Sequence, residues 1–139
     1  MKWVTWEHIG VDRMACIWVI LRHIDPDAEF LFIPVGHTPL PEGYEPFDIP
    51  GVRLSHRQGQ CSFQTILREY GLKDPILKHM AQIVTEADLV QEVSIEPAAY
   101  GLDLICRGLR RISPDDYVAL ERGCLVYDGL YAELSEAGG

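Results

Sequence analysis

The sequence predicts an α+β fold, with a small sheet of about three strands in the N-terminal half and helices in the C-terminal half. Three observations predict it. Short strand-like runs rich in Val, Ile, Phe and Trp lie within the first 56 residues. Apolar residues recur at helical spacing from residue 62 onward. The length of 139 residues suits one hydrophobic core, so residues 1–139 are expected to form a single domain.

The first two expected elements are a strand and an amphipathic helix. Residues 2–5 form a short run with Trp and Val that ends at polar residues, as a strand would. Between Val11 and Ile24, apolar residues recur at spacings of three and four, which indicates one buried helical face. Pro26 ends this helix, because proline cannot continue helical geometry. The helix would cross over from the first strand to the second.

Two further strands are expected before residue 57. Residues 28–35 carry a nearly continuous apolar run, which indicates a strand covered on both faces and a central place in the sheet. Residues 36–51 contain four prolines and three glycines and are expected to form a loop. Alternating apolar and polar residues then predict the third strand at 52–56.

The remaining chain is expected to form four helices that cover the sheet. Ser62 is a suitable N-cap for the first of them, and Asp74 followed by Pro75 is a strong helix start for the second. Asp116, in the first turn of the last, is placed like the acid of a capping box. The expected ranges are 62–70, 75–89, 97–110 and 113 onward.

Composition excludes several classes of function. A net charge of -9 opposes nucleic-acid binding, which needs clustered basic residues. No stretch of 18 apolar residues is free of charges, so no membrane span is expected. The N-terminal residues include Glu7 and His8 and do not resemble a secretory signal, which favours the cytoplasm. The four cysteines stand far apart, as expected for reduced, buried thiols.

A candidate anion site lies in the first predicted helix. Arg13 and Cys16 are three residues apart and therefore lie on one face, and Asp12 stands at the start of the helix. This spacing would bring a guanidinium, a thiol and a carboxylate together. In the alternative, Asp12 is only a cap, Arg13 forms a surface pair and Cys16 fills the core.

A second candidate segment follows the predicted third strand. His56 and Arg57 stand between that strand and the next helix, where free backbone N–H groups often build anion sites. We therefore expect His56 and Arg57 to bind an anion or a metal-bound ligand. The alternative is an ordinary solvated turn.

His56 and two acidic residues form a candidate metal site. Glu29 would meet His56 if the second and third strands are neighbours, and Asp88, in an apolar part of its helix, would complete the set. Imidazole with carboxylates suits Fe, Mn or Zn, so a divalent ion of this kind is a candidate cofactor.

Five ordered motifs extend along most of the chain: Val11-Asp12-Arg13-Met14-Ala15-Cys16, Asp25-Pro26-Asp27-Ala28-Glu29, Phe47-Asp48-Ile49-Pro50-Gly51, Ser55-His56-Arg57 and Tyr127-Asp128-Gly129-Leu130-Tyr131. Together they resemble the chromate-resistance protein family, the domain that forms the C-terminal part of the chromate-sensing regulator ChrB. The resemblance implies oxyanion sensing through Arg13, Cys16 and His56. Trp6 and Ile17 depart from the family pattern, which often has arginine and proline there.

The leading functional hypothesis is a cytoplasmic domain that binds or senses a small inorganic oxyanion or another small ligand, directly or through a divalent metal ion. Arg13, His56 and Arg57 would contact the anion through charge-assisted hydrogen bonds. One alternative is a small metal-dependent enzyme that uses Glu29, His56 and Asp88. Another is a non-catalytic partner-binding subunit, and a homo-oligomer is compatible with each hypothesis.

Overall fold

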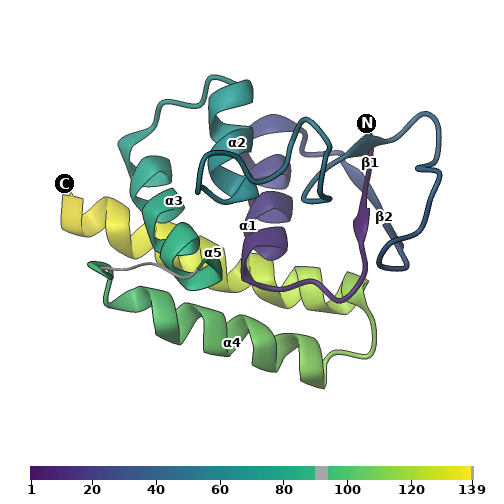
Figure 1. Ribbon diagram of the computed structural model, residues 1–139. Coiled ribbons are helices and arrows are strands. Elements are labelled where there is room, and N and C mark those ends of the chain that lie inside the picture. Colours follow the sequence, from purple (N-terminus) through teal and green to yellow (C-terminus); the bar gives the residue numbers. More distant parts are fainter. Residues whose placement is uncertain (90–93, 139) are drawn as a thin grey trace.

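The computed structural model describes residues 1–89 and 94–138 and has the predicted α+β architecture. A small parallel sheet in the N-terminal half packs with helices from the whole chain (Figure 1). The elements are β1 (Lys2–Trp6), α1 (Val11–Val19), the π-helical turn η1 (Ile20–Ile24), β2 (Glu29–Ile33), β3 (Glu45–Pro46), α2 (Ser62–Glu69), α3 (Pro75–Asp88), α4 (Ala98–Ile112) and α5 (Asp116–Gly138).

The sheet has the order β2-β1-β3, so the predicted central place of β2 is wrong. Strand β1 is central, and Trp3, Val4 and Thr5 in it are fully buried. Within residues 1–89 and 94–138, strand β2 pairs with β1 alone, and its first residue, Glu29, is exposed. Its apolar run reflects partial cover by neighbouring side chains, such as Tyr117 against Phe32, rather than strands on both sides.

The predicted third strand at 52–56 is also wrong. The third strand is the two-residue β3, which pairs in parallel with Trp3 and Val4 of β1. Pro46 is tolerated there because the strand lies at the edge of the sheet. Leu54 instead forms a single bridge with Phe47, and the N–H of Asp48 donates to the carbonyl of Leu54 at 2.8 Å. The loop therefore folds back on itself, which buries Leu54 without a strand.

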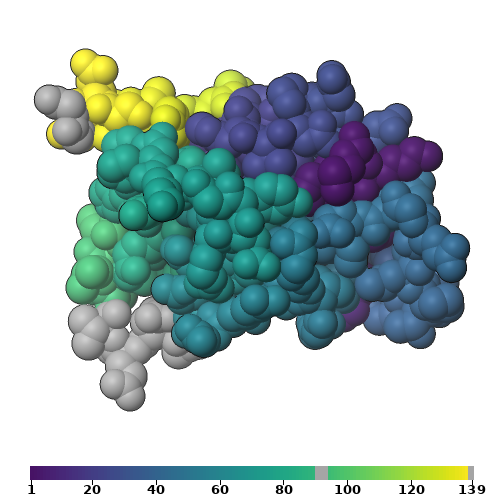
Figure 2. Space-filling view, turned by 90° about the horizontal axis from the view of Figure 1, so that it is seen from above, coloured from purple at the N-terminus to yellow at the C-terminus, as the bar shows by residue number. Residues whose placement is uncertain are grey.

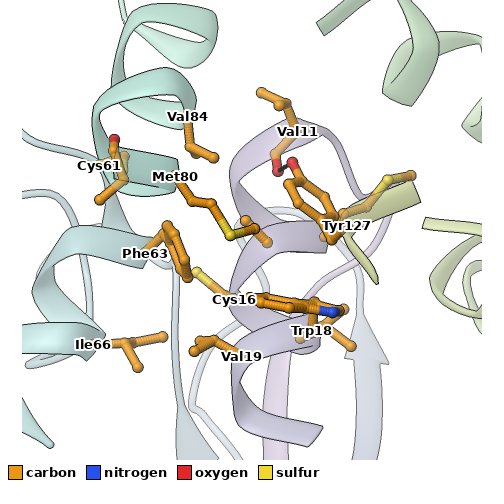
Figure 3. Close-up of a cluster of buried hydrophobic side chains, with 14 of the residues drawn as sticks. Val11, Cys16, Trp18, Val19, Cys61, Phe63, Ile66, Met80, Val84 and Tyr127 are labelled. Atoms are coloured by element: carbon orange, nitrogen blue, oxygen red, sulfur yellow. Dashed lines mark hydrogen bonds between the residues drawn. The ribbon is translucent and has the colours of Figure 1, made fainter. Parts of the chain in front are cut away.

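Helix α1 is the centre of the molecule (Figure 1). It contacts α2, α3, α4 and α5, and of its residues only Arg13 is not buried. A helix that is apolar on nearly all sides is typical of such a position. Figure 3 shows Cys16 and Trp18 of α1 beside Phe63, Met80 and Tyr127 from the surrounding helices. The connection β1-α1-β2 is the predicted crossover.

Among the later helices, α3 has the predicted side-chain cap, and α4 and α5 begin near the predicted positions. Asp74 accepts a hydrogen bond from the N–H of Ile76 at 2.9 Å, so it caps α3 as predicted. Helix α4 extends two residues beyond the predicted end, and α5 starts at Asp116 and runs antiparallel to α4 (Figure 1). The predicted cap Ser62 is instead the first helical residue of α2.

Seen from above, the sheet and the loop after β2 occupy one end of the molecule, and α2, α3 and the C-terminal end of α5 extend to the other (Figure 2). The four cysteines are free thiols and are buried, as expected. Within the described residues, no helix has both the length and the apolar character needed to span a bilayer.

Candidate metal and oxyanion site

Asp12, in the first turn of α1, is the buried centre of the site. It is 3% exposed, and its Oδ2 accepts from the N–H of Ser62 at 2.8 Å while its Oδ1 accepts from the N–H of Phe63 at 3.0 Å. These are the unpaired N–H groups at the start of α2. The sequence predicts Asp12 at the start of its own helix, and in the structure this carboxylate also caps α2, a helix distant in sequence.

Asp48 joins the site from the loop that follows β3. Its Oδ2 accepts from Nε of Arg13 at 2.9 Å, and its Oδ1 accepts from the hydroxyl of Ser62 at 2.7 Å. Burial, together with the charge of Asp12, raises the pKa of Asp48 to about 7. Asp48 lies within the predicted loop at 36–51 and was not among the predicted site residues. The available signal was an acid between two apolar residues, Phe47 and Ile49, which are both buried.

His56 is surrounded by carboxylates. Its Nε2 lies 2.9 Å from Oδ2 of Asp12, 3.0 Å from Oδ2 of Asp88 and 3.8 Å from Oδ1 of Asp48. Hydrogen bonds to Asp12 and then to Asp88 raise the pKa of His56 to about 10. We refer to His56 with Asp12, Asp48 and Asp88 as the His56 cluster. Its members come from α1, the long loop and the C-terminal end of α3.

The hydrogen bonds of Arg13 hold this arrangement in place. Besides Asp48 Oδ2, its guanidinium donates to the backbone oxygens of Trp6, Glu7 and Asp48, each at 3.2 Å. The side chain is 17% exposed. Most of its N–H groups are therefore occupied, and its main role in the structure is to orient Asp48.

Cys16 lies beneath the cluster rather than at its surface. The thiol is fully buried, with Sγ 3.8 Å from Oδ1 of Asp12. Burial, reinforced by the charge of Asp12, raises its pKa well above the ordinary value, and burial does the same for Cys61. Thiols of this kind stay protonated and are poor nucleophiles or ligands.

Two of the predicted site residues lie outside the cluster. Glu29 pairs in register with Lys2 at the opposite end of β1 from Trp6, which places it roughly 13 Å along the strand from Trp6. Arg57 is exposed and forms a backbone bridge with Gln60 in a tight turn. Asp88, which was predicted from its apolar setting, does meet His56.

Two cavities adjoin the cluster, and Arg13 and Asp48 line both of them. One, of about 360 Å³, is lined by Trp6, Arg13, Asp48, Ser55 and His56 together with the Ile49–Gly51 turn. Within the described residues, the buried Nε1 of Trp6 has no hydrogen-bond partner. The other, of about 210 Å³, lies toward α4.

The cluster has the donors of a transition-metal site. One oxygen each from Asp12 and Asp48 and one nitrogen of His56 lie within 4.8 Å of one another. Carboxylate and imidazole donors suit Zn, Mn and Fe. The guanidinium of Arg13 binds Oδ2 of Asp48 and the N–H of Phe63 binds Oδ1 of Asp12, which are the carboxylate oxygens not in contact with His56. Partners behind metal ligands hold their outer oxygens in the same way.

Comparison with known proteins agrees with the sequence motifs. Residues 3–134 match the family described as ChrB, C-terminal domain. Protein ChrB of Cupriavidus metallidurans is 33% identical over 135 residues, which cover 96% of this chain and 41% of that protein. The chain thus spans about two fifths of the length of this relative. No solved structure has a significant match. The chain therefore belongs to the ChrB C-terminal domain family, as its ordered motifs predicted.

Proposed function

We propose that this domain binds a small oxyanion by means of a divalent metal ion held by Asp12, Asp48 and His56. One observation carries the proposal. A single ring nitrogen, Nε2 of His56, lies within 3.8 Å of oxygens from three aspartates. That nitrogen carries at most one proton and can satisfy only one carboxylate fully. A divalent ion would accept oxygens from several carboxylates at once.

Electrostatics support the metal-assisted form of the hypothesis over direct anion binding. A free anion at His56 would face three carboxylates, and most donors of Arg13 are already occupied. Like charges at such distances repel each other strongly where bulk water does not screen them. A bound ion would offset the carboxylates and leave coordination positions for ligand oxygens. The family resemblance adds chromate-type oxyanions as the ligand class.

The chain's own residues would then have distinct roles. Asp12 would join the ion to the N-terminus of α2, because it already accepts the N–H groups of Ser62 and Phe63. Arg13 would keep Asp48 ionised and oriented. Asp88 would supply a further oxygen from the end of α3.

Metal titration of the full chain tests the proposal. Isothermal titration with Zn²⁺ and Mn²⁺, after treatment with a chelator, is expected to show one equivalent bound to the wild type and a large loss of affinity in Asp48→Asn and His56→Gln. His79→Gln is the matched control, because His79 also contacts a carboxylate, Glu96 at 2.9 Å, but lies on another face.

Three results would contradict the proposal. One is a wild-type protein that binds neither ion. Another is equal loss of affinity in His79→Gln and His56→Gln. The third is binding of chromate or sulfate that is equally tight with and without the metal.

A further inference from the structure

The cavity toward α4 places two arginines opposite the proposed ion. Three aspartates of the His56 cluster, 12, 48 and 88, form one wall together with Arg13. Asp103, Arg107 and Arg110 line the cavity from α4, and His8 lies at the same cavity. None of these α4 residues stood out in the sequence, because Arg107 and Arg110 are about 50 residues from His56 along the chain.

Arg110 has spare hydrogen-bonding capacity. Its Nη1 reaches the carbonyl oxygen of His8 at 3.4 Å, a long contact, and no carboxylate pairs with it within residues 1–89 and 94–138. Arg107 differs, since its Nε donates to Oδ2 of Asp103 at 2.9 Å. Arg13, the third arginine at the cavity, is bound to Asp48. Arg110 is therefore the guanidinium best able to take a new partner.

The charge of the cavity supports an anionic partner only when an ion is bound. Its four aspartates and three arginines leave one negative charge, which the protonated His56 beside them offsets while no ion is bound. A divalent ion at the cluster would change this to one net positive charge, with the ion on one wall and Arg110 on the other. A ligand that presents two or more oxygens can bind both, because a guanidinium binds paired oxygens in a planar, bidentate manner.

We propose that the oxyanion enters from the α4 side and bridges the metal ion and Arg110, with Arg107 beside it. This inference rests on the proposed metal site and adds the direction of entry and the specificity-determining residue. Tetrahedral inorganic oxyanions and small carboxylates share the required chemistry. Sulfate and malonate distinguish these two sources in the test.

The test separates binding of the ion from binding of the anion. The wild-type chain is loaded with Mn²⁺ and titrated with sulfate and, separately, with malonate. Arg110→Gln is expected to weaken binding of the preferred anion by about tenfold or more while Mn²⁺ affinity stays unchanged. Arg110→Lys is expected to lose less anion affinity than Arg110→Gln, because it keeps the positive charge. Some affinity should still be lost, because lysine lacks the planar pair of donors.

Arg111→Gln is the matched control, since Arg111 is the adjacent residue, is exposed and does not line this cavity. Anion affinity in Arg111→Gln equal to that of the wild type supports the inference. Wild-type anion affinity in Arg110→Gln, or no anion binding by the Mn²⁺-loaded wild type, overturns it. Absence of Mn²⁺ binding to the wild type overturns the proposed metal site instead.

Discussion

The carboxylate of Asp12 has two structural roles. It caps α2 through the N–H groups of Ser62 and Phe63, and it pairs with Nε2 of His56 at 2.9 Å. A buried carboxylate with this many donors is stable only while the donors remain, since each unpaired buried group is costly. Any ligand that moves Asp12 must therefore affect the start of α2.

We expect Asp12→Asn to lower the free energy of unfolding by about 2–4 kcal/mol, because the amide cannot accept all of these donors and leaves buried groups unpaired. Urea unfolding of the metal-free chain measures this change. Asp27→Asn, at an exposed turn, is the control and should leave stability nearly unchanged. Equal midpoints for the two variants would show that Asp12 is not a structural cap.

The pKa values of Asp48 and His56 predict how stability depends on pH. The pKa of Asp48 rises from 3.8 to about 7 through burial, and that of His56 rises from 6.5 to about 10 through its bonds to Asp12 and Asp88. The folded state therefore holds more protons than the unfolded state, so stability falls as pH rises. The contribution of His56 is fully present below pH 6.5 and is lost through about pH 10.

Chelator-treated protein should accordingly unfold at a lower urea concentration at pH 10 than at pH 6.5, and His56→Gln should show a smaller decrease. Added Zn²⁺ should oppose this trend, because metal ligands bind best when deprotonated. A metal-free wild type whose urea midpoint is constant over this range would contradict the assigned shifts.

Among the secondary-structure elements, α1 and α5 are in close contact, and this contact restricts how the helices can pack. Gly123 of α5 lies against Met14 of α1, and a Cβ at position 123 would be 2.9 Å from Met14 Sδ. Met14 is fully buried, so it has little room to move. Gly129, in the same helix, has no such neighbour within 4 Å.

These two glycines form a matched pair. We expect Gly129→Ala to stabilise the chain by about 0.5–1 kcal/mol through helix propensity. Gly123→Ala should instead destabilise it by about 1–3 kcal/mol, because the extra carbon overpacks the core. Thermal or urea unfolding measures both. Equal stabilisation by the two substitutions would mean that α1 and α5 are not in close contact at this point.

Elements with strong local signals could be predicted from the sequence. Helix α1 followed from its apolar spacing, and α3 from the Asp74-Pro75 start. The strands were less predictable: residues 52–56 alternate as a strand would, yet Leu54 is buried by a single bridge to Phe47. Alternation reports which side chains are buried, and a loop that folds back can bury them equally well.

At the scale of the whole molecule, the His56 cluster joins segments from three parts of the chain. Asp12 comes from α1, Asp48 and His56 from the loop before α2, and Asp88 from the end of α3. An ion held by all of them would bind only the folded state. Such a ligand stabilises the fold by mass action.

We therefore expect Zn²⁺ or Mn²⁺ at about 100 times its dissociation constant to raise the free energy of unfolding by about 2.7 kcal/mol. Denaturant unfolding with and without metal measures the increase. His56→Gln should lose most of it, whereas His79→Gln should retain it. A rise of the same size in both variants would indicate binding elsewhere on the surface.

From the sequence alone we could predict the fold class, the helices with clear caps and periodicity, and the family. It also indicated Asp12, Arg13, His56 and Asp88, which the structure brings close together. These depend on local spacing and ordered motifs, which a linear chain displays directly. The tertiary structure alone decided that β1 is central, that Asp12 caps α2, that Asp48 completes the cluster, and that Glu29 lies far from it. Those outcomes depend on which distant segments pack together, and that choice follows from burial of the whole core rather than from any local pattern.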